Sequence, residues 1–227
     1  MWIILTLVVF YLARAFARKY PHPLNSAFLI SMFIIIPTLL LLDIPYDTYF
    51  RDNYPIHYLL QPAVVALAYP LYEQLPAIRA HWKLILFTCT VGCFMSMLVS
   101  GVIAILLGAE MHLVAAILPK SVTTPISMAI AEQLGGEPAI ASILVIIAGV
   151  TGSIFAYPIY KAININNSVA KGITMGCVSH GLGTAKSVEV HAKDGAFSSL
   201  AMVICGVITS LIAPVIFSLL TLMNQYL

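Results

Sequence analysis

A lysine and three hydroxyl side chains stand between two prolines inside a strongly apolar stretch. The run reads LPKSVTTP and covers residues 118–125. Proline lacks a backbone N–H and clashes with the preceding helical turn, so Pro119 and Pro125 predict a broken helix. Broken backbone at bilayer depth is tolerated only where protein or a water-filled cavity surrounds it, and such breaks mark substrate sites in secondary transporters. We therefore expect a binding site in this run.

Lys120 is the strongest candidate for contact with a ligand. An ionisable group at the centre of an apolar helix costs roughly 3 kcal/mol or more unless it is paired or hydrated. An anionic substrate would offset that cost, and a half-helix beginning near Thr124 and Pro125 would add positive potential. The alternative is that Lys120 extends to the membrane interface. The hydroxyls of Ser121, Thr123 and Thr124 can donate to a carboxylate or satisfy backbone carbonyls that the prolines leave free.

A second polar group interrupts the apolar pattern further along the chain. It consists of Ser179, His180 and Thr184. Here Gly181 and Gly183 are the expected helix breakers, and their small size allows close approach of a ligand or a crossing segment. His180 could carry a coupling proton, and the alternative is a hydrogen-bonded structural histidine.

Enzymatic and metal chemistry find no support in the spacing of these residues. Ser179 and His180 are adjacent, the surrounding string is not Gly-x-Ser-x-Gly, and neither interrupted segment contains an aspartate. No HExxH motif or carboxylate pair appears, so we expect no enzyme, no metal and no cofactor. The four cysteines lie in apolar stretches without metal-ligand spacing, and we interpret them as packing residues. They are Cys89, Cys93, Cys177 and Cys205.

Composition places these residues in a membrane protein. Of 227 residues, 61% are hydrophobic and only 9% are charged, and the mean hydropathy is +0.99. The net charge of +2 is small and scattered, which excludes nucleic acid as a partner. The lipid bilayer is therefore the expected environment.

The apolar stretches predict about seven to eight membrane segments in an all-α membrane domain that covers residues 1–227. Continuous segments are expected at residues 2–16, 25–42, 56–75, 84–107, 138–160 and 196–222, and interrupted ones at 111–134 and 169–190. The acidic stretch 43–55 is placed as an outside loop, and the basic stretch 79–83 as a cytoplasmic one. If Lys161 and Lys171 are cytoplasmic, both ends of segment 111–134 lie outside and the segment is re-entrant. If this segment crosses the membrane instead, the two lysines lie outside and break the positive-inside rule. The sequence leaves both options open.

The order of segments suggests a repeat. A continuous segment followed by an interrupted one occurs at 84–134 and again at 138–190, which is the pattern of an inverted repeat in secondary transporters. Small residues along 84–107 and 195–209 favour helix association. We predict a homodimer on that basis.

These motifs resemble the LrgB/CidB family, the larger membrane subunits of bacterial holin/antiholin-like systems. The resemblance rests on residues 118–125 and on SHGLGTA at 179–185, with similar stretches at 61–74 and 195–201. It implies a multi-pass protein of the bacterial inner membrane, a small LrgA-like membrane partner, and a link to murein hydrolase export and autolysis. Plastid relatives, in which an LrgA-like part is fused to an LrgB-like part, export glycolate and import glycerate. Some bacterial pairs are linked to pyruvate uptake.

Residues and resemblance together predict a carrier that moves a small monocarboxylate such as pyruvate, glycolate or lactate by alternating access. Lys120 would hold the carboxylate, with a proton or a sodium ion as the coupling ion. Hydrogen bonds would come from Ser121, Thr123, Thr124, Ser179 and Thr184. The competing hypothesis is a holin/antiholin-like modulator that transports nothing itself. A channel is less favoured because the breaks offer no ring of like charges.

Overall fold

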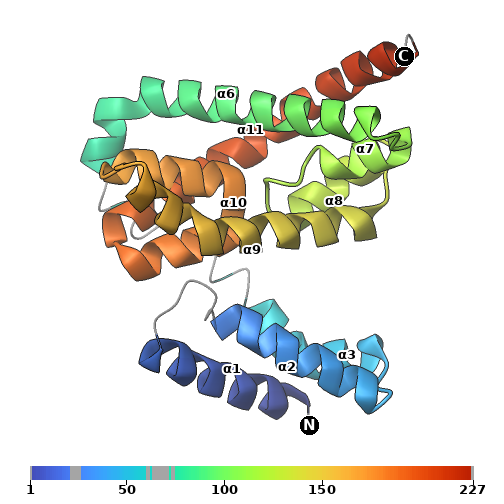
Figure 1. Ribbon diagram of the computed structural model, residues 1–227, viewed down its shortest axis with the longest axis vertical. Coiled ribbons are helices and arrows are strands. Elements are labelled where there is room, and N and C mark those ends of the chain that lie inside the picture. Colours follow the sequence, from blue (N-terminus) through green and yellow to red (C-terminus); the bar gives the residue numbers. More distant parts are fainter. Residues whose placement is uncertain (1, 21–26, 60–61, 63–71, 73–74, 226–227) are drawn as a thin grey trace. The chain divides into compact units, whose positions relative to one another are not determined.

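The computed structural model describes residues 2–20, 27–59, 62, 72 and 75–225, and these form nine helices and no strand (Figure 1). The all-helical prediction is confirmed for this part of the chain. Two compact units can be distinguished, Met1–Ala68 and Tyr69–Leu227. A single membrane domain over the whole chain stays a prediction.

The first unit contains α1 (Trp2–Lys19), α2 (Ala27–Leu41) and α3 (Tyr46–Tyr58), with α1 packed against the other two. The Tyr49 and Thr6 hydroxyls lie 2.8 Å apart and join α3 to α1. Most of the stretch 43–55 is thus helical, and the prediction of a loop there is wrong. Asp47 in the first turn of α3 interacts favourably with the helix dipole, and the ring of Phe50 lies 5.8 Å from that of Tyr46, one turn away.

The second unit is built on three long apolar helices. They are α6 (Leu75–Leu106), α9 (Pro138–Ala162) and α11 (Ala192–Asn224). By length and composition, Trp82–Leu106, α9 and α11 can cross a membrane. The basic stretch 79–83 belongs to α6 rather than to a loop, because arginine and lysine are good helix formers. The predicted segment 56–75 lies largely outside the described residues, so the total of seven to eight segments stays a prediction.

The Pro-bracketed segment is a helical hairpin, here called hairpin A. It comprises α7 (Met111–Ile117), an irregular turn at 118–123, and α8 (Thr124–Gln133). Pro125 stands in the first turn of α8, where its missing N–H costs nothing. After α8, a Cβ on Gly136 would lie 2.9 Å from the carbonyl oxygen of His112, at the start of α7. The segment therefore enters and leaves at one end, between the end of α6 and the start of α9 (Figure 1).

The second interrupted segment, α10 (Ser168–Val190), also turns back on itself and is here called hairpin B. Its backbone is non-helical at His180, with φ 39° and ψ −129°. A Cβ on Gly183 would lie 3.0 Å from the Met175 carbonyl oxygen, whereas eight residues of straight helix span about 12 Å. The interruption thus falls at His180 rather than at the predicted breakers Gly181 and Gly183. Gly183 instead lets the two arms approach closely.

The two hairpins enter the second unit from opposite ends of α9. The base of hairpin A directly precedes α9, and its tip reaches Ser96 near the middle of α6. The base of hairpin B lies at the other end of α9, where the Tyr160 hydroxyl donates to the Lys171 carbonyl (3.4 Å), and its tip reaches Val145. Opposed hairpins fit an inverted repeat, which stays a prediction.

The small residues of α11 pack inside the chain. Ala196, Ser198 and Ser199 are fully buried, and a Cβ on Gly176 of hairpin B would overlap the Ser198 carbonyl oxygen. On α6, Gly101 lies against Leu220 of α11 in the same way. Much of the small-residue surface on which the homodimer was predicted thus serves contacts within one chain, and the homodimer itself stays a prediction.

Candidate functional site

Lys120 lies at the tip of hairpin A and points toward the middle of α6. Its Nζ donates to Ser96 Oγ (3.0 Å) and to the Ser96 carbonyl oxygen (3.2 Å). The Ser121 and Ser96 hydroxyls lie 3.1 Å apart. Within the described residues no carboxylate reaches Lys120, so its charge is solvated only by neutral oxygens. This geometry favours the binding interpretation of Lys120 over the interfacial one.

Thr123 and Thr124 form the start of α8. Thr123 is the N-cap residue, with φ −67° and ψ 150°, but its side chain makes no capping hydrogen bond. The unpaired N–H groups of this first turn therefore add positive potential at the tip of hairpin A. Both threonines are half-buried, and neither hydroxyl has a hydrogen-bond partner within the described part of the chain. They remain able to donate to an anion.

A small cavity lies beside this tip. Its volume is about 10 Å³, which is close to the room that one water molecule needs. It is lined by Leu118, Ser121 and Val122 of hairpin A, Cys93, Ser96 and Met97 of α6, Cys177 of hairpin B, and Cys205 and Thr209 of α11. A carboxylate with three carbons would need more space, so a substrate can enter only if the surrounding helices move.

The predicted residues of hairpin B face α9 and α11 instead of this cavity. His180 Nε2 donates to the Val145 carbonyl oxygen of α9 (2.9 Å). Thr184 Oγ1 donates to the His180 carbonyl oxygen (2.7 Å), and Ser198 Oγ of α11 lies 2.8 Å from Thr184 Oγ1. Ser179 is fully buried, its Oγ has no hydrogen-bond partner within the described residues, and a Cβ on Gly152 of α9 would overlap this Oγ. The contact of His180 with Val145 corresponds to the alternative in which His180 is a hydrogen-bonded structural histidine.

The two polar groups contact different helices, since that of hairpin A contacts α6 and that of hairpin B contacts α9 and α11. No hydrogen bond joins Lys120 or Ser121 to Ser179, His180 or Thr184 within the described residues. The contribution of hairpin B to the cavity is Cys177, three residues before its tip. The sequence suggested one polar site shared by both hairpins. In this arrangement the hairpins do not form such a site.

The profile of the LrgB-like family matches residues 6–219. The chain belongs to the LrgB-like family. This confirms the resemblance drawn from the motifs at 118–125 and 179–185, and both motifs lie at hairpin tips.

Three relatives of this LrgB-like chain match it over nearly their whole lengths. A protein of Haemophilus influenzae is 41% identical over 95% of this chain and 94% of its own. CidB of Staphylococcus aureus, named a holin-like protein, is 32% identical over 94% of this chain and 93% of its own. YwbG of Bacillus subtilis is 31% identical over 94% of this chain and 95% of its own. No solved structure matches the chain.

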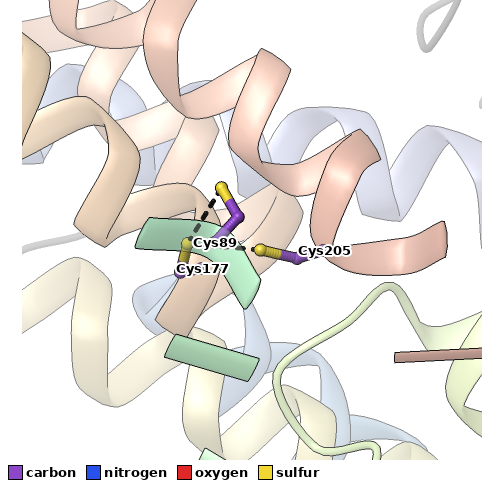
Figure 2. Close-up of side chains that lie close together, drawn as sticks. All are labelled: Cys89, Cys177 and Cys205. Carbon is purple, nitrogen blue, oxygen red and sulfur yellow. Dashed lines mark hydrogen bonds between the residues drawn. The ribbon is translucent and has the colours of Figure 1, made fainter. Parts of the chain in front are cut away.

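The cysteines of this LrgB-like chain are a feature that spacing did not reveal. The sulfur atoms of Cys89, Cys177 and Cys205 all lie within 4.8 Å of one another, although they come from three different helices (Figure 2). Cys93 lies next to this group, with its sulfur 3.9 Å from the Cys205 carbonyl oxygen. The only hint in the sequence was the i, i+4 spacing of Cys89 and Cys93, which places both on one face of α6.

Asp194, at the base of hairpin B, is a buried carboxylate that sequence reasoning also missed. Its Oδ2 accepts a hydrogen bond from Tyr157 (3.0 Å), while Oδ1 is buried without a hydrogen-bond partner among the described residues. His191 Nδ1 lies 3.7 Å from Oδ1 but accepts the Lys193 N–H (3.2 Å), so it cannot also donate to the carboxylate. In the same part of the chain, the buried Ser187 hydroxyl has no hydrogen-bond partner. An aspartate directly before an apolar run of more than twenty residues was the signal for this site.

Proposed function

We propose that this LrgB-like protein is an alternating-access carrier for small monocarboxylates such as pyruvate, glycolate and lactate. The observation that carries the proposal is Lys120, an ammonium group at the tip of hairpin A with no carboxylate partner within the described residues. A desolvated cation of this kind is stabilised when an anion binds. The small cavity next to Ser121 is the place where a carboxylate would enter after the helices move.

Four polar residues at the tip of hairpin A have roles in this proposal. Lys120 pairs with the carboxylate, and the hydroxyls of Ser121, Thr123 and Thr124 donate to its oxygens or to an adjacent keto or hydroxyl group. The N-terminal turn of α8 adds positive potential. Ser179, His180 and Thr184 would reach the ligand only if hairpin B moves relative to α9.

A coupling ion has two candidate positions at hairpin B. His180 is the candidate for a proton, as the sequence suggested. Asp194 is the second, because its Oδ1 is a buried oxygen without a hydrogen-bond partner among the described residues. A proton on the carboxylate would remove its buried charge, and a sodium ion beside Oδ1 would give that oxygen a partner.

The competing function is a holin/antiholin-like modulator of murein hydrolase export and autolysis that transports nothing itself. It is favoured by the relatives named CidB, which are called holin-like proteins. In both functions we expect the bacterial inner membrane, a small LrgA-like membrane partner and a homodimer.

Uptake into proteoliposomes separates the two functions. Purified protein, alone and with its LrgA-like partner, is reconstituted and supplied with labelled pyruvate, glycolate or lactate under a proton or a sodium gradient. We expect uptake by the wild type and none by Lys120→Ala at equal protein content. Lys186→Ala is the matched control, because that lysine pairs with Glu189 (3.4 Å) at an exposed position.

The same assay tests the coupling ion. Asp194→Asn should retain substrate exchange between loaded vesicles but lose its response to the gradient, because the amide cannot be protonated and binds sodium weakly. Absence of flux of all three acids under both gradients, with the LrgA-like partner present, would contradict the carrier function. The holin/antiholin-like modulator would then be the remaining candidate function.

A further inference from the structure

Three thiols from distant parts of the chain converge in the interior of the second unit. Cys89 comes from α6, Cys177 from the first arm of hairpin B and Cys205 from α11, and Figure 2 shows their side chains pointing toward one another. Cys177 Sγ lies 3.2 Å from Cys205 Sγ and 3.7 Å from Cys89 Sγ. All three residues are buried. Chance packing of apolar helices does not require the few thiols of a chain to gather at one point.

We propose that Cys89, Cys177 and Cys205 form a binding site for a thiophilic monovalent metal ion, copper(I). A metal–sulfur bond is roughly 2.3 Å long, which places the sulfurs of neighbouring ligands roughly 4 Å apart. The observed separations of 3.2 and 3.7 Å, with all three sulfurs within 4.8 Å, come close to that arrangement before any ion is bound. Small side-chain rotations would complete it.

The ligand set selects the kind of metal. The group contains sulfur only, which disfavours hard cations such as magnesium, calcium and sodium. Zinc in closed protein sites is tetrahedral and needs a further ligand, whereas copper(I) accepts fewer soft ligands. The neighbouring groups are soft as well, since Met97 and Cys93 line the adjacent cavity. A single positive charge also requires fewer thiolates in this apolar interior than a divalent ion would.

Binding would be a ligand exchange without a redox step. Each thiol that becomes a ligand as thiolate releases its proton to solvent, and the copper ion keeps its oxidation state. The ion would join one arm of hairpin B to α6 and α11, directly beside the cavity that Cys177 and Cys205 line.

Copper(I) titration of the purified full-length protein, in detergent with a chromogenic copper(I) chelator as competitor, tests the proposal. We expect one ion per chain, with thiolate-to-copper charge-transfer absorption in the near ultraviolet. Cys89→Ser, Cys177→Ser and Cys205→Ser should each weaken binding by at least about tenfold. Cys93→Ser is the matched control, since this cysteine lies on the same face of α6 but outside the group, and it should bind as the wild type does.

A second measurement needs no variant. X-ray absorption at the copper edge of the wild-type complex should show a first shell of sulfur alone. A nitrogen or oxygen shell, or equal binding by the triple serine variant, would overturn the proposal. So would preferential retention of zinc, or a Cys177–Cys205 disulfide in metal-free protein isolated without reductant. None of these readouts depends on transport, so the site and the carrier function can fail separately.

Discussion

Ser96 is the residue on which the polar contacts of hairpin A converge. Its hydroxyl accepts from Lys120 Nζ and contacts the Ser121 hydroxyl, and its carbonyl oxygen accepts a second bond from Lys120. A serine near the middle of an apolar helix thus solvates the ammonium group in place of water. It also orients Lys120 toward α6, at a serine that lines the cavity.

At this scale we predict that Ser96→Ala raises the KM for substrate by about three- to tenfold, because a hydrogen bond to a charged group contributes roughly 1 kcal/mol or more. Initial uptake rates in proteoliposomes at several substrate concentrations measure the change.

Ser100→Ala is the control for this prediction, one turn along α6. Its hydroxyl donates only to carbonyl oxygens of its own helix, those of Ser96 and Met97. We expect an unchanged KM. Equal effects of both variants would indicate general damage to α6 and remove Ser96 from the site.

Hairpin B and α9 interlock through glycines at the scale of the elements. A Cβ on Gly149 would lie 2.6 Å from His180 Nε2, and one on Gly152 would overlap Ser179 Oγ. The tip of the hairpin thus packs against α9 where Gly149 and Gly152 leave room for it. The positive φ of His180 is stabilised there by the bond from its ring to the Val145 carbonyl oxygen.

We predict that Gly152→Ala lowers the free energy of unfolding by about 1–3 kcal/mol, because the added methyl group forces the hairpin tip off α9. Thermal unfolding in detergent, followed by circular dichroism, should show a melting temperature several degrees lower.

Gly181→Ala is the matched control in hairpin B itself. A Cβ there would meet no atom within 4 Å, and Gly181 does not have a positive φ. Its melting temperature should equal or slightly exceed that of the wild type, since alanine is the better helix former. A destabilisation as large as that of Gly152→Ala would contradict the packing argument.

The whole molecule offers a simple route to alternating access within the second unit. Hairpin A and hairpin B enter from opposite ends of α9, and the cavity beside the tip of hairpin A, to which hairpin B contributes Cys177, holds little more than a water molecule. Movement of one hairpin would open that cavity toward one end of α9, and movement of the other would open it toward the opposite end.

Labelling from each side of the membrane tests this motion. In a cysteine-free background, Ser121→Cys should react with a membrane-impermeant maleimide in both right-side-out and inside-out vesicles, and pyruvate should slow the reaction. Glu110→Cys, at the exposed base of hairpin A, should react from one side only. Labelling of Ser121→Cys from a single side under every condition would contradict alternating access.

The sequence alone determined the class of protein, the family and the place where hairpin A breaks. Apolar composition demands a membrane-type helical fold, and Pro119 and Pro125 end and begin helices because of their own ring geometry. These properties are local, so they can be read from neighbouring residues. The polar tip of hairpin A was predicted for the same reason.

The tertiary structure decided what those local features contact. Four features depend on residues 24 to 116 positions apart or on packing against another helix: the hairpin form of both interrupted segments, the kink at His180, the bond from Lys120 to Ser96, and the meeting of Cys89 with Cys177 and Cys205. Contacts at such separations follow from how helices close-pack, and no spacing along the chain encodes which faces meet.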